Sequence, residues 1–94
     1  VSNSFKIEQN YPNPFNPTTQ LNYTLYKQSF VNITIFDISG KIVKNLKSQV
    51  ESSGYQTSQW NGMNNKGHQV SSGIYLYMID TGDYRQTKKM TLLR

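Results

Sequence analysis

The side chains that could perform catalysis are few in this chain of 94 residues, and they are scattered along it. His68 is the one histidine, it lies in a Gly- and Asn-rich stretch, and cysteine is absent. None of the five carboxylates forms a pair between apolar neighbours that would raise one pKa. No serine has the surroundings of a nucleophile elbow, and no glycine-rich phosphate loop occurs. We therefore expect a protein that is not an enzyme, with His68 exposed in a loop.

The stretch "NGMNNKG" at 61–67 carries oxygen-bearing side chains at short intervals, a spacing that could suit a hard cation. A Ca²⁺ loop uses carboxylates, one of them bidentate. This stretch offers only Asn61, Asn64 and Asn65, with Lys66 among them. Asn and Gly are also the residues that tolerate the positive φ of turns. The sequence therefore predicts a turn here, with no metal and no cofactor.

Aromatic side chains suggest a second chemistry, because seven Tyr and one Trp could stack on sugar rings. Trp60 ends an expected strand just before a Gly turn, where a ring packed at a corner of the core is the simpler interpretation. Tyr75 and Tyr77 alternate with Leu76 and Met78, so at least one of these pairs faces the core. A carbohydrate-binding or spacer module of a secreted polysaccharide-degrading enzyme, using Trp60 or exposed Tyr, stays the alternative function.

The net charge of +5 could serve a polyanion such as nucleic acid, lipopolysaccharide or an anionic membrane. The basic residues are spread along the chain until Arg85, Lys88, Lys89 and Arg94, which follow the last acid, Asp83. An ordinary solvated surface explains this distribution, and no nucleic-acid-binding motif is present. We expect no nucleic-acid partner.

A chain of this length predicts one domain with one core. The longest apolar run, 74–79, is far shorter than the about 20 residues that span a bilayer, so no transmembrane segment is expected. No segment has the pattern of a signal peptide. We expect either a cytoplasmic chain or the tail of a longer precursor whose targeting signal lies elsewhere.

Alternation of apolar and polar residues predicts six or seven short strands and no helix. One strand follows Thr18, and the stretch 30–43 holds a strand, a turn at "DISG" and the start of a return strand, "KIVKNL". The polar stretch 47–54 is predicted to be a loop. This spacing of strands and turns is typical of an immunoglobulin-like antiparallel β-sandwich of about seven strands, an all-β fold.

Three more elements complete this pattern. "YQTSQW" at 55–60 predicts a strand, and a Gly- and Asn-rich loop follows it. "IYLYMID" at 74–80 is apolar on both faces, which predicts a central strand covered on both sides. "TGD" makes a tight turn into the last strand, "YRQTKKMTLLR".

Prolines mark the beginning of the expected domain. Residues 1–10 are polar and predict a linker end or a short first strand, and the domain itself is placed at 11–94. Three prolines occur within 12–17, and each fixes its own φ and lacks a backbone donor. The segment 11–17 is therefore predicted to be a stiff, extended strap that joins no central strand pairing.

Four segments in this order carry a family resemblance: "YPNPFNPTT" at 11–19, "VNITIFDISGKIV" at 31–43, "GYQTSQWNGMNNKGHQVSSGIYLY" at 54–77 and "QTKKMTLLR" at 86–94. The combination resembles the C-terminal sorting domain (type A) of the type IX secretion system. It is also similar to the immunoglobulin-like domain of flagellar hook-assembly scaffold proteins. The ending after "KKMTLL" favours the sorting-domain version over a scaffold domain.

The resemblance implies a non-catalytic domain at the C-terminus of an exported precursor, following an N-terminal cargo domain. Such a domain reaches the periplasm, is recognised by the outer-membrane type IX machinery and is often removed by a sortase-like peptidase. The cargo is secreted or held at the cell surface, in some systems on surface polysaccharide.

The resemblance also implies a set of motif residues: Tyr11, Pro12, Asn13, Pro14, Asp37, Gly40, Trp60, Gly62, Gly73 and Tyr75. The chain departs from the family pattern at two places. Relatives commonly have acids where Asn61 and Asn64 stand, and often Pro where Ser71 or Ser72 stands.

The last strand is the expected recognition element. We expect Lys88, Lys89 and Arg94 to offer a positive edge, while Met90 and Leu92 anchor the strand to the sandwich. Lysine on an edge strand is also a common protection against aggregation, so the charges alone do not decide between these roles.

Overall fold

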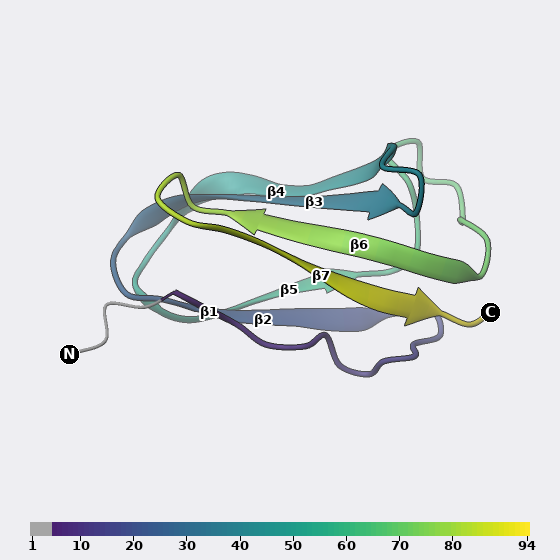
Figure 1. Ribbon diagram of the computed structural model, residues 1–94, viewed down its shortest axis with the longest axis horizontal. Coiled ribbons are helices and arrows are strands. Elements are labelled where there is room, and N and C mark those ends of the chain that lie inside the picture. Colours follow the sequence, from purple (N-terminus) through teal and green to yellow (C-terminus); the bar gives the residue numbers. More distant parts are fainter. Residues whose placement is uncertain (1–4) are drawn as a thin grey trace.

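Two antiparallel β-sheets pack face to face, without any helix, in the computed structural model, which describes residues 5–94 (Figure 1). The smaller sheet has the order β1-β2-β5 and the larger has the order β4-β3-β6-β7. The strands are β1 (Lys6–Ile7), β2 (Thr19–Leu25), β3 (Ser29–Asp37), β4 (Ile42–Glu51), β5 (Gly54–Trp60), β6 (Gly73–Asp80) and β7 (Arg85–Leu92). The predicted all-β sandwich of about seven strands is confirmed. Residues 1–4 of the expected linker lie outside the described part of the chain.

The core lies between the sheets because one face of each central strand is apolar. In β2, β3 and β6 every second side chain is buried, as the alternation predicted. Burying a side chain such as Ile33 stabilises the fold by roughly 1.5–3 kcal/mol, an upper figure. The fully buried aromatic and aliphatic side chains are Trp60, Tyr23, Tyr77, Phe15, Leu21, Val31, Ile33, Ile35, Ile79, Met90 and Leu92.

The indole ring of Trp60 closes one end of this core. Its centroid lies 5.7 Å from the ring of Phe15 and 5.4 Å from the ring of Tyr75, at tilted and edge-to-face angles. Its Nε1 donates a hydrogen bond of 2.9 Å to the carbonyl oxygen of Met63. Tyr75 and Tyr77 are thus the core-facing pair of β6.

The predicted loop at 47–54 is wrong in its first part, because β4 continues to Glu51. β4 is an edge strand. Its pairing with β3 shifts register twice, so that Val43 and Leu46 have no partner residue in β3 and form β-bulges. Both bulges lie within 42–46, which was predicted as a strand, whereas 47–51 pairs with β3 without a shift and is mostly exposed and polar. The polar sequence of an edge strand therefore reads as a loop.

The prediction that β6 is covered on both faces is also wrong. β6 is central in its sheet, between β3 and β7, as expected. Its outward side chains, Leu76 and Met78, are half-buried, and Ile74 is exposed. Neighbouring side chains on the same face, Phe36 beside Leu76 and Thr34 beside Met78, shield them in part.

The proline-rich strap (residues 11–17) bends where an extended segment was predicted. Tyr11 pairs with Gln20 beside the smaller sheet, whereas Phe15 bridges to Leu92 of the larger sheet. The strap therefore crosses from one sheet to the other within four residues. Before it, β1 pairs with β2, and Phe5 and Ile7 enter the core.

Within residues 5–94, no helix is long and apolar enough to cross a membrane.

Candidate functional site

The last strand, β7, carries the residues that sequence analysis selected for recognition. Met90 and Leu92 are fully buried, so they anchor the strand as predicted. Lys89 is exposed on the outer face and Lys88 is half-buried on the opposite side. Neither lysine forms an ion pair within the described residues. The two ammonium groups are therefore available to a partner.

The strap and the residues just before it cover the outer edge of β7. The Phe15 N–H donates to the Thr91 carbonyl oxygen (3.0 Å), and the Leu93 N–H donates to the Phe15 carbonyl oxygen (2.9 Å). The Thr91 N–H donates to Asn13 Oδ1 (3.0 Å). Gln9 Nε2 donates to the Lys89 carbonyl oxygen (2.9 Å). The two segments are thus hydrogen-bonded to each other, although they lie at opposite ends of the sequence.

A buried polar network fixes the start of the strap. The Tyr77 hydroxyl donates to the Glu8 carbonyl oxygen and accepts from the Asn10 N–H, both at 3.0 Å. Asn10 Nδ2 donates to Thr19 Oγ1 (3.0 Å), and this hydroxyl donates to the Pro12 carbonyl oxygen (2.9 Å). Burial raises the pKa of Tyr77 to about 12, and the hydrogen bond from Asn10 opposes that shift in part.

Arg94 is not the free positive charge that the sequence predicted. Its Nε donates to the Val70 carbonyl oxygen (2.5 Å) and its Nη2 donates to the Gly62 carbonyl oxygen (2.7 Å). Its backbone N–H donates to Ser72 Oγ (2.8 Å). The guanidinium group therefore ties both ends of the loop 61–72 to the residues after β7. Of the three expected cations, only Lys88 and Lys89 remain available.

Gly62 is needed where Arg94 approaches. Its φ is +75°, a backbone conformation that residues other than Gly rarely adopt. A Cβ at this position would lie 2.8 Å from Arg94 Nη2 and 3.2 Å from the Pro17 carbonyl oxygen. The motif glycine thus creates room for the guanidinium group.

The other motif residues have structural positions. Asp37 Oδ1 accepts hydrogen bonds from the N–H groups of Ser39 and Lys41, each 3.0 Å, and from Ser39 Oγ (2.7 Å). These hydrogen bonds hold the pKa of Asp37 below its usual value, and the bond from the Ser39 hydroxyl contributes most. Gly40, with φ of +91°, completes this turn. Gly73 begins β6, and the buried Tyr75 donates its hydroxyl to the Ser71 carbonyl oxygen (2.6 Å).

Asn64 forms the turn that was predicted in place of a metal loop. Its Oδ1 accepts from the N–H groups of Lys66 (2.9 Å) and His68 (3.0 Å). Asn65 Oδ1 accepts from the Asn45 N–H of β4 (3.0 Å). His68 is exposed, as expected. Within residues 5–94, no three His, Cys, Asp or Glu side chains gather as metal ligands would.

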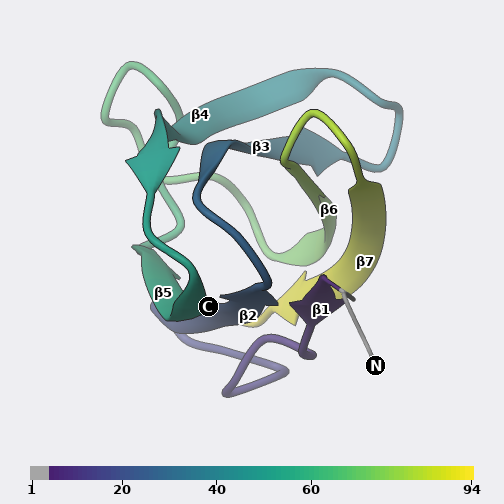
Figure 2. The same ribbon diagram turned by 90° about the vertical axis from the view of Figure 1, so that its left-hand side faces the viewer.

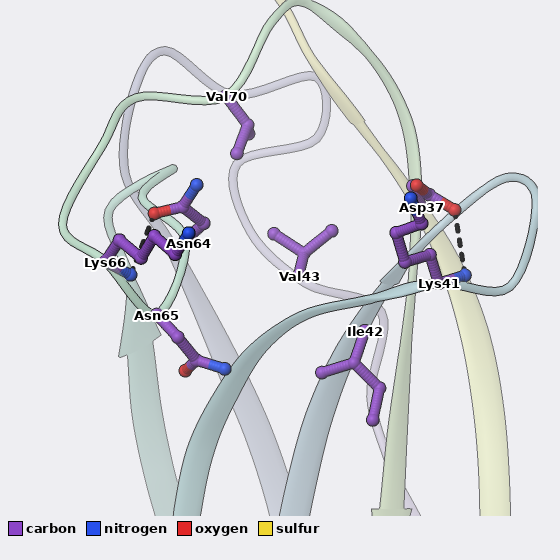
Figure 3. A pocket seen from close by; sticks show the side chains of 8 residues that line it. All are labelled: Asp37, Lys41, Ile42, Val43, Asn64, Asn65, Lys66 and Val70. Carbon is purple, nitrogen blue, oxygen red and sulfur yellow. Dashed lines mark hydrogen bonds between the residues drawn. The ribbon is translucent and has the colours of Figure 1, made fainter.

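A shallow cleft of about 370 Å³ lies between the turn at 37–41 and this loop (Figure 3). Val43, Val70 and Ile42 give it an apolar floor, with Lys41 near one end and Lys66 near the other. The only carboxylate in the lining, Asp37, is occupied by its own turn. These groups suit the binding of an apolar segment with a negative charge and provide no acid–base pair.

One buried cluster was missed by sequence analysis. Tyr23 of β2 donates its hydroxyl to Glu51 of β4, and Lys47 Nζ lies 2.6 Å from the other carboxylate oxygen of Glu51. Lys47 also donates to the Tyr23 hydroxyl (3.2 Å). Burial, followed by the hydrogen bond and the charge of Glu51, raises the pKa of Tyr23. The even spacing of Lys47 and Glu51 would have placed both side chains on one face of a strand. This was not recognised, because 47–54 was predicted to be a loop.

In the alternative carbohydrate-binding function Trp60 would stack on a sugar ring, but its ring is fully buried and cannot do so. The exposed tyrosines are spread over different elements. Tyr11 lies in the strap, Tyr26 follows β2, Tyr55 lies in β5 and Tyr84 precedes β7.

Residues 16–83 match the FlgD Ig-like domain family, so the predicted immunoglobulin-like fold is confirmed. A sequence comparison with curated proteins gives no match. The crystal structure of dimeric latent PorU from Porphyromonas gingivalis superposes with a TM-score of 0.70. Its identity is 17%, and the match covers 95% of this chain and 9% of PorU.

PorZ from the same organism superposes with a TM-score of 0.63 and 19% identity, over 94% of this chain and 11% of PorZ. PorZ is described as an essential bacterial surface component of the type IX secretion system. At these identities the likeness shows a shared fold. The chain spans about a tenth of the length of either protein.

Proposed function

Because the chain belongs to the FlgD Ig-like domain family, we propose that it is a non-catalytic sorting domain of the type IX secretion system. It directs an attached exported protein through the outer membrane to the cell surface. Its partners are the outer-membrane machinery, a sortase-like peptidase and, for some cargo, surface polysaccharide. The likeness to PorZ over 94% of the chain supports this assignment, since PorZ is a surface component of that system.

One structural observation carries the proposal: β7 and the strap form a single hydrogen-bonded surface. A sorting domain must present the same surface whatever protein is attached to it. The strap is fixed to the core through Asn10 and Tyr77, and β7 through Met90 and Leu92. Both segments of this surface are thus anchored to the core.

The carboxylates support a role without catalysis. Glu51 pairs with Lys47, Asp80 with Arg85 and Asp83 with Lys27. Asp37 is held within its turn. Four of the five carboxylates therefore already have structural partners, which leaves little for acid–base chemistry.

The test uses the chain fused behind a fluorescent reporter with a secretory signal, in a bacterium that has type IX secretion. Deleting 86–94 is unsuitable, because it removes Met90 and Leu92 from the core. The double variant Lys88→Glu/Lys89→Glu reverses the two available charges of β7. We expect the reporter to reach the surface with the unchanged domain and to stay in the periplasm with this variant.

Lys6→Glu/Lys44→Glu is the matched control, because it makes the same charge change outside β7 and outside the cleft, at lysines that form no ion pair among residues 5–94. It should be exported normally. Failure of the unchanged domain to export the reporter would contradict the sorting function itself. Normal export of a folded Lys88→Glu/Lys89→Glu variant would contradict only the role of these lysines.

A further inference from the structure

Hydrogen bonds within the chain position the cleft between the turn at 37–41 and the loop 61–72. The Asn65 N–H donates to the Val43 carbonyl oxygen, and the Asn45 N–H donates to Asn65 Oδ1, both at 3.0 Å. Figure 2 shows this loop, in light green, beside β4 at the edge of the larger sheet. Arg94 ties both ends of the loop to the residues after β7. The folded chain therefore forms the cleft by itself, before any partner binds.

The floor of the cleft is an apolar surface that the fold leaves partly uncovered. Val43 and Val70 pack against the core from outside and stay half-buried. Ile42 beside them is 53% exposed. Figure 3 shows Val43 in the middle of the cleft, between the ends at which Lys41 and Lys66 lie. A concave apolar surface of this kind favours contact with an apolar side chain.

The end of the cleft near Lys66 is rich in hydrogen-bond donors. Asn64 Oδ1 accepts from two N–H groups of its own loop, and Asn65 Oδ1 accepts from the Asn45 N–H. The two amide nitrogens form no hydrogen bond among residues 5–94 and remain as donors. The Lys66 ammonium forms no ion pair within the same residues. This end thus offers three side-chain donors and no carboxylate, which suits a negatively charged acceptor.

The opposite end of the cleft is closer to neutral. Lys41 lies near Asp37, and its positive charge helps to lower the pKa of that carboxyl, after the larger effect of the Ser39 hydroxyl. The Asp37 carboxylate therefore stays ionised and offsets part of the Lys41 charge. A negative charge on a ligand is consequently favoured at the Lys66 end.

We propose that this cleft binds an extended peptide segment of a partner protein, which places an apolar side chain on Val43 and Val70. A carboxylate two residues away in that segment meets Lys66 and the amides of Asn64 and Asn65. Side chains two residues apart face the same side of an extended chain, so both can enter the cleft together. The net charge of +5 also attracts an acidic partner over distance.

The shape of the cleft favours a peptide over a lipid. The cleft is shallow, holds about 370 Å³ and has only three apolar side chains in its lining. One apolar side chain can cover them, whereas an acyl chain would leave most of its methylene groups in water. The site lies apart from β7 and the strap, so it adds a contact to the proposed sorting function and does not depend on it.

Two-dimensional NMR of the purified, isotope-labelled chain tests the proposal. The probes are acetyl-Ser-Leu-Ser-Glu-Ser-amide and the reversed order, acetyl-Ser-Glu-Ser-Leu-Ser-amide, because the segment can run in either direction. We expect the better probe to bind with a Kd of about 1 mM and to shift the amide signals of Val43, Asn65, Lys66 and Val70. Replacing Glu of the probe by Gln, or Leu by Ser, should weaken binding at least about threefold.

Two pairs of variants locate the site. Lys66→Gln should weaken binding at least about threefold, and Lys44→Gln, which removes the same charge from β4 outside the cleft, should not. Val43→Thr should weaken binding at least about twofold because it places a hydroxyl on the floor. Val50→Thr makes the same change on an exposed part of β4 and should leave binding unchanged.

The absence of shifts with both probes at about 5 mM overturns the proposal. Equal binding of the Gln or Ser probe, or unchanged binding by the folded Lys66→Gln variant, overturns it as well. Sodium octanoate supplies a carboxylate on an acyl chain, and tighter binding of octanoate than of either peptide would overturn the peptide as occupant. None of these outcomes bears on export of the fused reporter, so the sorting function is judged separately.

Discussion

Arg94 Nη2 donates a hydrogen bond of 2.7 Å to the carbonyl oxygen of Gly62, and Arg94 Nε binds the Val70 carbonyl oxygen. One side chain after β7 thereby joins both ends of a loop that lies more than twenty residues earlier. The loop in turn supplies Met63, the acceptor for the Trp60 indole. The arginine therefore supports one end of the core.

Arg94→Met should loosen the loop 61–72, because the Gly62 and Val70 carbonyls lose their charged donor. We expect a loss of about 0.5–1.5 kcal/mol in the free energy of unfolding. Amide exchange at Val70, whose N–H donates to the Gly62 carbonyl oxygen, should become faster. Exchange at Ile33 in the core should follow only the global change, and equal acceleration at both sites would contradict a local role.

Gly62→Ala should destabilise the protein by more than Gly67→Ala. Both glycines have a positive φ, +75° and +80°, so both substitutions cost roughly 1–2 kcal/mol of backbone strain. Only at Gly62 would the added Cβ also contact Arg94, since no atom lies within 4 Å of a Cβ at Gly67. Urea denaturation of the two variants measures the difference, and equal losses would show that the Arg94 contact is easily accommodated.

Tyr77→Phe should cost about 1–3 kcal/mol, because the buried Asn10 N–H and the Glu8 carbonyl lose their partner. Tyr75→Phe is a matched control, since it removes one hydroxyl that donates to the Ser71 carbonyl and leaves no orphaned donor. Denaturation of both variants compares them. A larger loss for Tyr75→Phe would contradict the importance of the strap network.

Stability should decrease at alkaline pH as the buried tyrosines titrate. The pKa of Tyr77 is about 12 in the folded protein and near 10 when unfolded, so the folded state holds its proton more tightly. Its contribution is complete below pH of about 10 and is lost as pH rises toward about 12. The raised pKa of Tyr23 acts in the same direction. Urea denaturation between these pH values should show a shallower decline for Tyr77→Phe than for the unchanged chain.

Lys47→Met should be strongly destabilising, because it leaves the buried Glu51 carboxylate without its cation. Removing one partner of a buried ion pair costs about 3–5 kcal/mol. Lys44→Met, on the same strand and outside any ion pair among residues 5–94, should change stability little. Thermal denaturation distinguishes them, and similar melting temperatures would mean that water solvates Glu51.

The strands at the centre of the sheets could be predicted from sequence alone. In β2, β3 and β6 the buried side chains alternate, because a strand turns successive side chains to opposite faces. The turns at Asp37 and Asn64 were also recognisable, since these side chains bond to backbone groups only a few residues away. The family resemblance followed from the same local segments.

Tertiary structure decided what depends on residues far apart in the chain. The bulges of β4, the crossing of the strap onto β7 and the Tyr23–Glu51–Lys47 cluster all join different elements. The engagement of Arg94 by Gly62 and Val70 is of the same kind. Sequence periodicity reports which face a residue occupies, because that depends on local backbone geometry. It does not report which side chain lies opposite, because packing brings that partner from elsewhere in the chain.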